Sequence, residues 1–389
     1  MRKSSNEVFS TVRVLQFGRF WNEQHGGIER HVSLLGQGLA AQGVEVVNLV
    51  AATGRGGTDE TQGLYRLIRT PSFGEAYSMA LSPALVWKAF TLHRQKPFDI
   101  LHLHFPDPLS HITSMLLPSN VRRVITWHSD IIRQKRLLAL YQPLLSRITR
   151  QADALVAATQ AHFDGSTQIP KDIPTERCHV IPYGLDYTPL ELNARTAALR
   201  DQLRVRSQGR GLVFALGRHV YYKGFNVLID ALQHADAFLI LGGDGPLRPQ
   251  LELQAAKLGL SHRILFTGHI PEEDLAAYFH ACDVFCLPAV ERSEAFGLVQ
   301  LEAMACGKPV VCTQLNNGVN VVNVDGQTGF AVPVRDPVAL GKCLAQLLGD
   351  HALRQKLGAQ ALAHTDGYSV RSMTASHIKL YQDLLSTHL

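Results

Sequence analysis

The chain contains 389 residues, a length that favours two domains over one, and 46% of them are hydrophobic, as globular cores require. The net charge of +5 is a mild excess that does not indicate a nucleic-acid partner. No apolar run reaches 18 residues, and the six cysteines lack Cys-x2-Cys spacing, so we expect no membrane-spanning helix, zinc site or disulfide framework. Residues 1–15 lack the apolar core of a signal peptide, which predicts a reduced, cytoplasmic protein.

Short apolar segments alternate with helical stretches along the first half of the chain, which predicts an α/β fold with parallel strands. A helix is expected over residues 27–42, closed by Gly43. Residues 182–189 carry a proline near each end and are predicted to form a hinge. Strands are expected at residues 12–17, 44–50, 99–102, 124–127, 154–158 and 179–181.

The segment between Asp130 and Asp153 contains five basic residues and no acidic one. Leucine, isoleucine and tyrosine side chains interleave with them, which predicts an amphipathic basic helix interrupted by Pro143. Such a helix can lie on an anionic membrane, or it can be an ordinary surface helix that packs its apolar face on a sheet. The basic residues of this membrane hypothesis are Arg133, Lys135, Arg136, Arg147 and Arg150.

The alternation restarts in the second half, with strands expected at residues 212–216, 237–241, 263–266, 284–287 and 310–312. The chain is therefore predicted to form two Rossmann-like domains, residues 1–187 and 188–366, followed by an amphipathic helix over residues 367–389. Ligands of doubly wound sheets bind beyond the carboxyl ends of the strands, so two such domains facing each other would enclose a cleft.

Paired glycines, Gly26 and Gly27, open the first predicted helix and let a ligand approach the backbone closely. No complete Gly-x-Gly-x-x-Gly is present there or at residues 242–246, which disfavours a dinucleotide-dependent oxidoreductase. His128 follows a predicted strand, where it would either project into the cleft or be a satisfied structural histidine.

Another group of histidines begins at the end of the strand at residues 99–102. His102 and His104, with Asp107 and His111, resemble metal ligands in type and spacing. No cysteine or glutamate joins them, so we expect a wall of the cleft there rather than a metal site.

Glu294 and Glu302 stand eight residues apart, the first in a loop and the second in the helix predicted after Gly297. A helix that begins after glycine presents free backbone N–H groups and a positive dipole end to a phosphate. Two carboxylates beside it can accept hydrogen bonds from sugar hydroxyls. The segment therefore suits a nucleotide sugar, although a solvated helix carboxylate is the simpler interpretation of Glu302 alone.

Two cations, Arg218 and Lys223, follow the first strand of the second half in a loop closed by Gly224. Cations at the carboxyl end of a strand suit a diphosphate, because they stabilise the charge that a departing nucleotide gains. The chain has no Asp-x-Asp pair to hold a metal ion, so these cations would act without metal or cofactor. The alternative is a pair of solvated loop cations.

Residues 293–311 resemble the hallmark segment of the retaining GT-B glycosyltransferases of family 4, in which Glu-x7-Glu precedes Ala-x-Ala-x-Gly-x-Pro-Val, here residues 303–310. The resemblance covers nearly the whole chain and implies a GT-B fold, α/β with two Rossmann-like parallel-sheet domains facing across a cleft and a last helix that crosses back to the first domain. It implies that Glu302 contacts the ribose. The catalytic residues that it implies are His128 and Glu294 at the donor sugar and Arg218 and Lys223 at the diphosphate. The other donor-binding residues that it implies are Gly26, Gly27, Gly243, Ile270, Phe296, Gly297, Leu298 and Val299.

Residues 314–329 are similar to the Thr-Gly-Val-Ser-Trp-Val-Asn segment of bacterial mannosyl- and rhamnosyltransferases, with Asn317 in place of the threonine. Residues 127–135 and 217–224 resemble the same subgroup. The resemblance implies a transfer reaction that is retaining and independent of metal, with mannose or a 6-deoxymannose supplied by a GDP-sugar. The implied acceptor is a lipid-linked or polysaccharide intermediate of a bacterial surface glycan, met at the inner face of the membrane. Two alternatives stay open: a nucleotide-sugar 2-epimerase of GT-B fold, and a non-catalytic nucleotide-sugar-binding partner.

Overall fold

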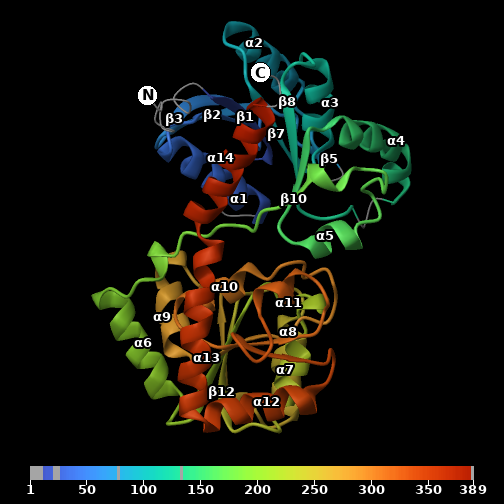
Figure 1. Ribbon diagram of the computed structural model, residues 1–389. Helices are drawn as coiled ribbons and strands as arrows, with labels where there is room; N and C mark the ends of the chain where they lie inside the picture. Colours follow the sequence, from blue (N-terminus) through green and yellow to red (C-terminus); the bar gives the residue numbers. More distant parts are fainter. Residues whose placement is uncertain (1–11, 21–26, 77–78, 132–134, 387–389) are drawn as a thin grey trace. The chain divides into compact units, whose positions relative to one another are not determined.

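The computed structural model describes residues 12–20, 27–76, 79–131 and 135–386 (Figure 1). The chain divides into two compact units: unit 1 comprises Met1–Leu185 and Ser369–Leu389, and unit 2 comprises Asp186–Tyr368. The sequence-based boundaries at residues 187 and 366 lie close to the two points where the chain passes between the units. Unit 1 is therefore built from both ends of the chain, and unit 2 from one continuous segment.

Unit 1 contains a sheet of eight strands among the described residues, all parallel except β3, which pairs antiparallel with β4. A separate pair, β5 (Glu75–Ala76) and β6 (Met79–Ala80), is antiparallel. The order across the main sheet is β10 (Cys178–Val180), β9 (Ala154–Ala157), β8 (Arg122–Trp127), β7 (Ile100–Phe105), β1 (Arg13–Phe20), β2 (Glu45–Ala51), β4 (Tyr65–Thr70) and β3 (Thr58–Gln62).

Helices cover both faces of this sheet, because successive residues of its central strands point to opposite faces and both sets are apolar. Val14 lies in the core beneath α1, whereas its neighbour Leu15 lies in the core on the other face. The helices of unit 1 are α1 (Gly27–Ala41), α2 (Pro83–Gln95), α3 (Pro108–Leu116), α4 (Lys135–Gln151), α5 (Gln160–Gly165) and α14 (Val370–Ser386), with the 3₁₀ turn η2 (Thr175–Arg177).

The last helix, α14, packs beside α1 (Figure 1). Its Met373, Leu380 and Tyr381 are buried in the same core as Val32 and Leu35 of α1. The predicted C-terminal helix begins at Val370, after the 3₁₀ turn η7 (Thr365–Tyr368), and it completes the core of unit 1.

The basic helix α4 runs without a break through Pro143, so the predicted interruption is wrong. Proline cannot donate a hydrogen bond to the carbonyl of Ala139, but both residues are exposed and water can hydrate that carbonyl. Leu145 and Ile148 are buried against the sheet. The buried side of α4 therefore packs as in an ordinary surface helix.

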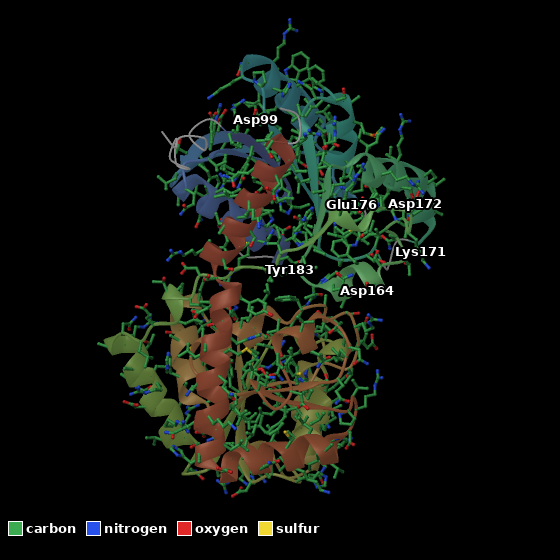
Figure 2. All side chains as sticks on the ribbon, in the orientation of Figure 1. Asp99, Asp164, Lys171, Asp172, Glu176 and Tyr183 are labelled. Atoms are coloured by element: carbon green, nitrogen blue, oxygen red, sulfur yellow. The ribbon has the colours of Figure 1, made fainter. Side chains whose placement is uncertain are left out.

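The outer side of α4 carries part of the predicted basic surface. Arg147 is exposed, whereas Arg150 pairs with Asp172 at 2.9 Å, near the rim of unit 1 (Figure 2). Arg133 lies outside the described residues, as do the side chains of Lys135 and Arg136. Among the helices that the structure describes, none combines the length and the apolar character needed to cross a bilayer.

Unit 2 contains a parallel sheet of six strands in the order β13 (Ile264–Gly268), β12 (Ala237–Gly242), β11 (Gly211–Leu216), β14 (Val284–Leu287), β15 (Val310–Thr313) and β16 (Gly329–Val332). The strand order reverses between β11 and β14, which makes their carboxyl ends the topological switch point where ligands bind in such sheets. Val213 packs on one face, and Phe214 meets Phe279 and Phe285 on the other.

The helices of unit 2 are α6 (Ala194–Arg206), α7 (Phe225–Ala231), α8 (Arg248–Lys257), α9 (Leu275–Ala281), α10 (Leu298–Ala305), α11 (Gly318–Val322), α12 (Pro337–Gly349) and α13 (His351–His364). Four further 3₁₀ turns are η3 (Thr188–Leu190), η4 (Tyr221–Lys223), η5 (Ser261–Arg263) and η6 (Glu272–Asp274). Two of these elements, η4 and α10, carry or follow the residues predicted to bind the nucleotide sugar.

Candidate active site

The strongest contact between predicted site residues is an ion pair in unit 2. Nζ of Lys223 lies 2.5 Å from Oε2 of Glu294, and the two side chains are 13% and 12% exposed. Lys223 follows β11 and Glu294 follows β14, so the switch point of the sheet brings these two loops together. The structure therefore joins two residues that the sequence assigned separately to a diphosphate and to a sugar.

The loop that carries Lys223 is fixed by Gly224. This glycine has φ of 67°, and a Cβ there would collide with the carbonyl oxygen of Pro288. The N–H of Val290 donates to the carbonyl of Tyr222 at 2.8 Å, which ties the two loops together beside the ion pair. Arg218, in the same loop, is exposed. A cation on a fixed loop is available to an anionic ligand without backbone rearrangement.

A second polar residue, Asn317, supports Glu294 from α11. Its Nδ2 donates to the carbonyl of Glu294 at 2.7 Å, and its Oδ1 accepts from the N–H of Val319 at 3.0 Å. Asn317 thus caps α11 and holds the backbone of the Glu294 loop at once. The sequence marked Asn317 only as a departure from a motif, because its partner lies 23 residues away.

The helix after Glu294 begins as predicted, since Gly297, with φ of 70°, is the N-cap of α10. Leu298 and Val299 form its first turn and are half-buried, and Phe296 is buried against Tyr368. Glu302 lies within α10 and is 8% exposed, so a freely solvated carboxylate is not what the structure shows. Burial, together with the nearby charge of Glu302, raises the pKa of Tyr187.

Two further predicted donor-binding residues lie at the ends of β12 and β13. Gly243 has φ of 98°, and a Cβ there would collide with the carbonyl oxygen of Gly217. The close approach of these two loops therefore requires glycine. Ile270, after β13, is buried.

In unit 1, the predicted residues lie at the start of α1 and after β8. Gly27 is the first residue of α1, whereas Gly26 lies outside the described residues. His128 directly follows β8, and its N–H donates to the carbonyl of Phe105 at 3.1 Å. Nδ1 of its ring lies 2.8 Å from the hydroxyl of Tyr183. His128 is thus a hydrogen-bonded histidine at the carboxyl end of a strand.

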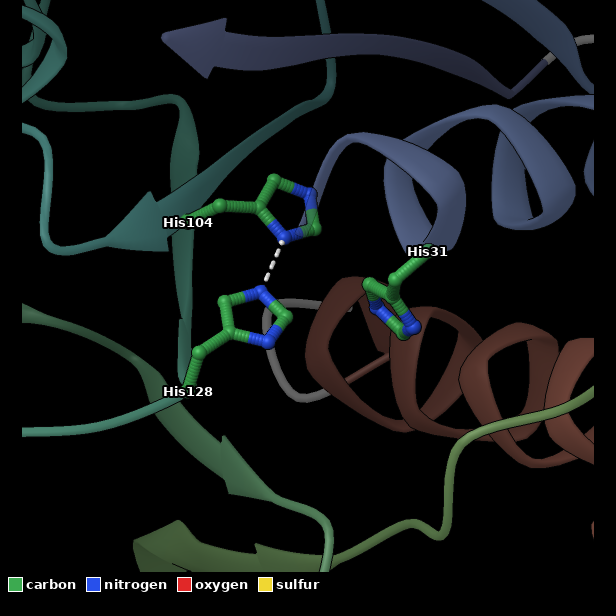
Figure 3. Close-up of side chains that lie close together, drawn as sticks. All are labelled: His31, His104 and His128. Carbon is green, nitrogen blue, oxygen red and sulfur yellow. Dashed lines mark hydrogen bonds between the residues drawn. The ribbon is translucent and has the colours of Figure 1, made fainter. Parts of the chain in front are cut away.

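The side chain of His128 is uncharged at neutral pH. It is 7% exposed, and burial lowers its pKa to about 3, with a smaller contribution from His162. Its Nε2 lies 3.0 Å from Nδ1 of His104 (Figure 3). A neutral imidazole can both donate and accept a hydrogen bond, and in this structure Tyr183 and His104 occupy its two nitrogens.

The histidines singled out in and after β7 lie in two places: His102 and His104 stack on each other in β7, whereas His111 lies in α3. His111 stacks on Phe105 and hydrogen-bonds to Tyr141. His102 turns to Tyr381 and Thr126, at 2.6 and 2.7 Å.

His104 instead meets His128 and His31, a residue of α1 that the sequence analysis did not select. No short sequence motif connects His31 with these two residues. The three histidines meet because the fold brings β7, the end of β8 and α1 together.

Comparison with known proteins shows the family to which the chain belongs. The family model "Glycosyltransferase Family 4" matches residues 25–188, and "Glycosyl transferases group 1" matches residues 200–364. D-rhamnosyltransferase WbpZ of Pseudomonas aeruginosa is 35% identical over 267 residues, which cover 68% of this chain and 68% of that protein. The chain belongs to the family 4 glycosyltransferases.

Other relatives of this glycosyltransferase match along its whole length. O-antigen chain mannosyltransferase C of Escherichia coli is 28% identical over 381 residues, which cover 97% of this chain and 100% of that protein. The structure of sucrose-phosphate synthase from Thermosynechococcus elongatus matches with a TM-score of 0.77 at 22% identity, over 97% of this chain and 100% of that one. WaaG, a glycosyltransferase involved in lipopolysaccharide biosynthesis, matches with a TM-score of 0.62 at 19% identity, over 95% and 99%. These likenesses confirm the predicted GT-B fold and the prediction of a glycosyltransferase.

Proposed function

We propose that this glycosyltransferase transfers mannose or a 6-deoxymannose from a GDP-sugar to a lipid-linked or polysaccharide acceptor in the synthesis of a bacterial O-antigen or related surface glycan. The proposal is supported by the names of two relatives, a D-rhamnosyltransferase and an O-antigen chain mannosyltransferase. The observation that carries the chemistry is the Lys223–Glu294 ion pair at the switch point of unit 2.

In the proposed reaction, the bond between the anomeric carbon and the diphosphate oxygen breaks as the acceptor hydroxyl attacks from the same face of the sugar. The acceptor oxygen forms the new glycosidic bond, and its proton passes to the departing phosphate. Lys223 and Arg218 stabilise the charge that gathers on this phosphate, assisted by the free N–H groups at the start of α10. Retention of configuration thus requires no covalent intermediate, and no metal ion takes part.

Glu294 is assigned to the hydroxyls of the donor sugar rather than to nucleophilic attack. Its carboxylate oxygens can accept hydrogen bonds from hydroxyls, and its pairing with Lys223 holds the ammonium group beside it. Glu302 is assigned to the ribose, and the backbone beside Ile270 to the base. His128 of unit 1 is assigned a hydrogen bond to the donor sugar, for which its neutral ring is suited.

We also propose that α4 contacts an anionic membrane loosely, on the cytoplasmic side. Leu137 and Leu140 are 41% and 81% exposed on this helix, and Arg147 is exposed beside them. Each basic residue near an anionic surface contributes about 1 kcal/mol. Because Arg150 is already paired with Asp172, it contributes less than its charge alone suggests.

A transfer assay tests the proposal directly. The purified protein is incubated with labelled GDP-mannose or GDP-rhamnose, with and without a lipid extract from a bacterium that makes such a glycan. Transfer of label only when extract is present, with the anomeric configuration retained by NMR, is the expected result. Interconversion of the sugar nucleotide without acceptor would instead identify an epimerase, and the absence of any product would identify a binding partner.

The same assay tests metal independence. EDTA should leave the rate of transfer largely intact, because fixed cations take the place of the metal ion that an Asp-x-Asp pair would hold. Loss of transfer in EDTA, with rescue by magnesium or manganese, would show that this part of the mechanism is wrong.

A further inference from the structure

Unit 1 contains a group of buried histidines, of which three bring their ring nitrogens together. His31, His104 and His128 each have a nitrogen that lies within 4.8 Å of one on each of the other two. The side chains come from α1, from β7 and from the residue after β8, and the three rings converge in Figure 3. They are 5%, 2% and 7% exposed, so the group is closed to bulk solvent.

Several nitrogens of this group find no hydrogen-bond partner within the described residues. These are Nδ1 and Nε2 of His31 and Nε2 of His104. A buried polar atom without a partner destabilises the folded state, and such atoms in a folded protein call for an explanation. An ion bound by one nitrogen of His31 would give that ring a partner that the described side chains do not supply.

The distance between two of the rings also suits a shared ion. Nδ1 of His104 and Nε2 of His128 are 3.0 Å apart. Two nitrogens bound to a tetrahedral zinc ion at about 2.0–2.1 Å lie about 3.3–3.4 Å from each other. A small rotation of these rings, with His31 moving toward them, would replace one hydrogen bond by bonds to an ion.

A second contact orients one of the rings for this role. The hydroxyl of Tyr183 lies 2.8 Å from Nδ1 of His128 and can accept a hydrogen bond from it. With its proton on Nδ1, His128 directs the lone pair of Nε2 toward His31 and His104. Histidines that bind metals usually have such a partner on the other nitrogen.

We propose that His31, His104 and His128 form a binding site for one zinc ion in unit 1. Three neutral imidazoles favour zinc over magnesium, calcium or manganese, which prefer oxygen ligands. Three protein ligands leave one tetrahedral position for water. The site shares His128 with the residues assigned to the donor sugar, although the proposed chemistry of transfer itself needs no metal.

Zinc at this site would have a functional consequence that rests on the proposed function. It would occupy Nε2 of His128, the residue assigned to the donor sugar, so zinc should inhibit transfer. Binding itself does not depend on that assignment, and it can be measured without any transferase activity.

The first experiment measures zinc binding to the metal-free full chain by calorimetry and by metal analysis after dialysis. We expect one tightly bound ion per chain, and His31→Gln should weaken its binding at least about tenfold. His31 is the informative position because neither ring nitrogen has a hydrogen bond to lose among the described residues. The matched control is His262→Gln, an exposed histidine in η5 of unit 2, which should leave binding unchanged.

The second experiment uses cobalt(II) as a spectroscopic substitute. Tetrahedral binding by imidazoles should give visible d–d bands without the near-ultraviolet charge transfer that a cysteine ligand would add. Tyr183→Phe should weaken binding about 10- to 100-fold, as removal of a partner behind a ligand does. Circular dichroism establishes that each variant is folded before binding is compared.

Three results would overturn the proposal: no stoichiometric ion in the folded wild-type chain, equal binding by the His31→Gln and His262→Gln variants, or a thiolate spectrum with cobalt. Failure of the proposed function looks different, because transfer would then be absent or insensitive to zinc while zinc binding persists.

Discussion

Nζ of Lys223 and Oε2 of Glu294 lie 2.5 Å apart although the two residues follow different strands, β11 and β14. Both side chains are largely buried, so each charge depends on the other for stabilisation. A bound donor would place phosphate oxygens near the ammonium group and hydroxyls near the carboxylate. Both side chains would then keep a partner of suitable charge or polarity when the ligand binds.

Lys223→Ala should lower kcat/KM for transfer about 10- to 100-fold, because a charge-assisted contact to phosphate contributes about 1.5–3 kcal/mol. Lys308→Ala is the matched control: Nζ of Lys308 donates to the carbonyl of His280 at 3.0 Å, away from the loops of the site. That variant should lose some stability and little activity. Steady-state kinetics on both folded variants gives the two values of kcat/KM. Equal decreases in kcat/KM would contradict the assignment of Lys223 to the diphosphate.

Asn317→Ala should raise the KM for the donor and destabilise unit 2 by about 1–3 kcal/mol. The change removes both the cap of α11 and the hydrogen bond to the carbonyl of Glu294. Gln314→Ala, at an exposed position nearby, serves as the control. If donor binding is unaltered in the folded Asn317→Ala protein, the loop of Glu294 does not need this support.

Unit 1 should lose stability as the pH falls below about 6.5. Burial lowers the pKa of its histidines in the folded state, so the unfolded state takes up protons first and is favoured by acid. For His111, whose pKa burial lowers to about 3, the loss at pH 5.5 is about 1.4 kcal/mol.

Urea unfolding at pH 7.5 and 5.5 tests this dependence, with tryptophan fluorescence as the probe. The three tryptophans, Trp21, Trp87 and Trp127, all belong to the chain segments of unit 1. His111→Gln should narrow the difference between the two pH values by about 1.4 kcal/mol, whereas His262→Gln should not. An unchanged difference in the His111 variant would mean that this ring is not held neutral.

GDP should raise the melting temperature more than UDP at the same concentration. Stabilisation follows RT ln(1 + [L]/Kd), so the nucleotide that binds more tightly produces the larger shift. Differential scanning fluorimetry over a range of concentrations gives the comparison. A larger shift with UDP would rule out the GDP-linked donor and leave the fold and family untouched.

Binding to anionic vesicles should weaken in salt and should fall further in Arg147→Ser than in Arg150→Ser. Arg147 is exposed on α4, whereas Arg150 already pairs with Asp172. Loss of about 1 kcal/mol corresponds to roughly fivefold weaker binding in a co-sedimentation assay. If the two variants weaken vesicle binding equally, or not at all, α4 is an ordinary packed surface helix. Replacing Arg133, Lys135 and Arg136 by serine tests the remaining basic residues of the membrane hypothesis.

The sequence predicted most strands of the two sheets because strands buried on both faces are continuous apolar runs. Its misses have physical reasons. β4 contains Arg66 and Arg69, which point to partners on β3 and interrupt the apolar run. Pro143 signals a break that solvent exposure makes unnecessary.

Glu294 and Lys223 could be selected from the sequence because each is a charged residue in a loop beside a glycine that precedes a helix. Their contact could not be predicted, since it depends on the order of strands across the sheet. Asn317 and His31 could not be selected, because each acts on partners that are distant in the sequence.

The placement of α14 has a consequence for synthesis on the ribosome. The core of unit 1 includes Met373, Leu380 and Tyr381, and Tyr381 hydrogen-bonds to His102, 279 residues earlier. Unit 2 is one continuous segment and can fold as soon as it has emerged. The nascent N-terminal part must wait through the translation of all of unit 2 with part of its core uncovered. Unit 1, whose synthesis begins first, therefore completes its core only after unit 2 has been translated.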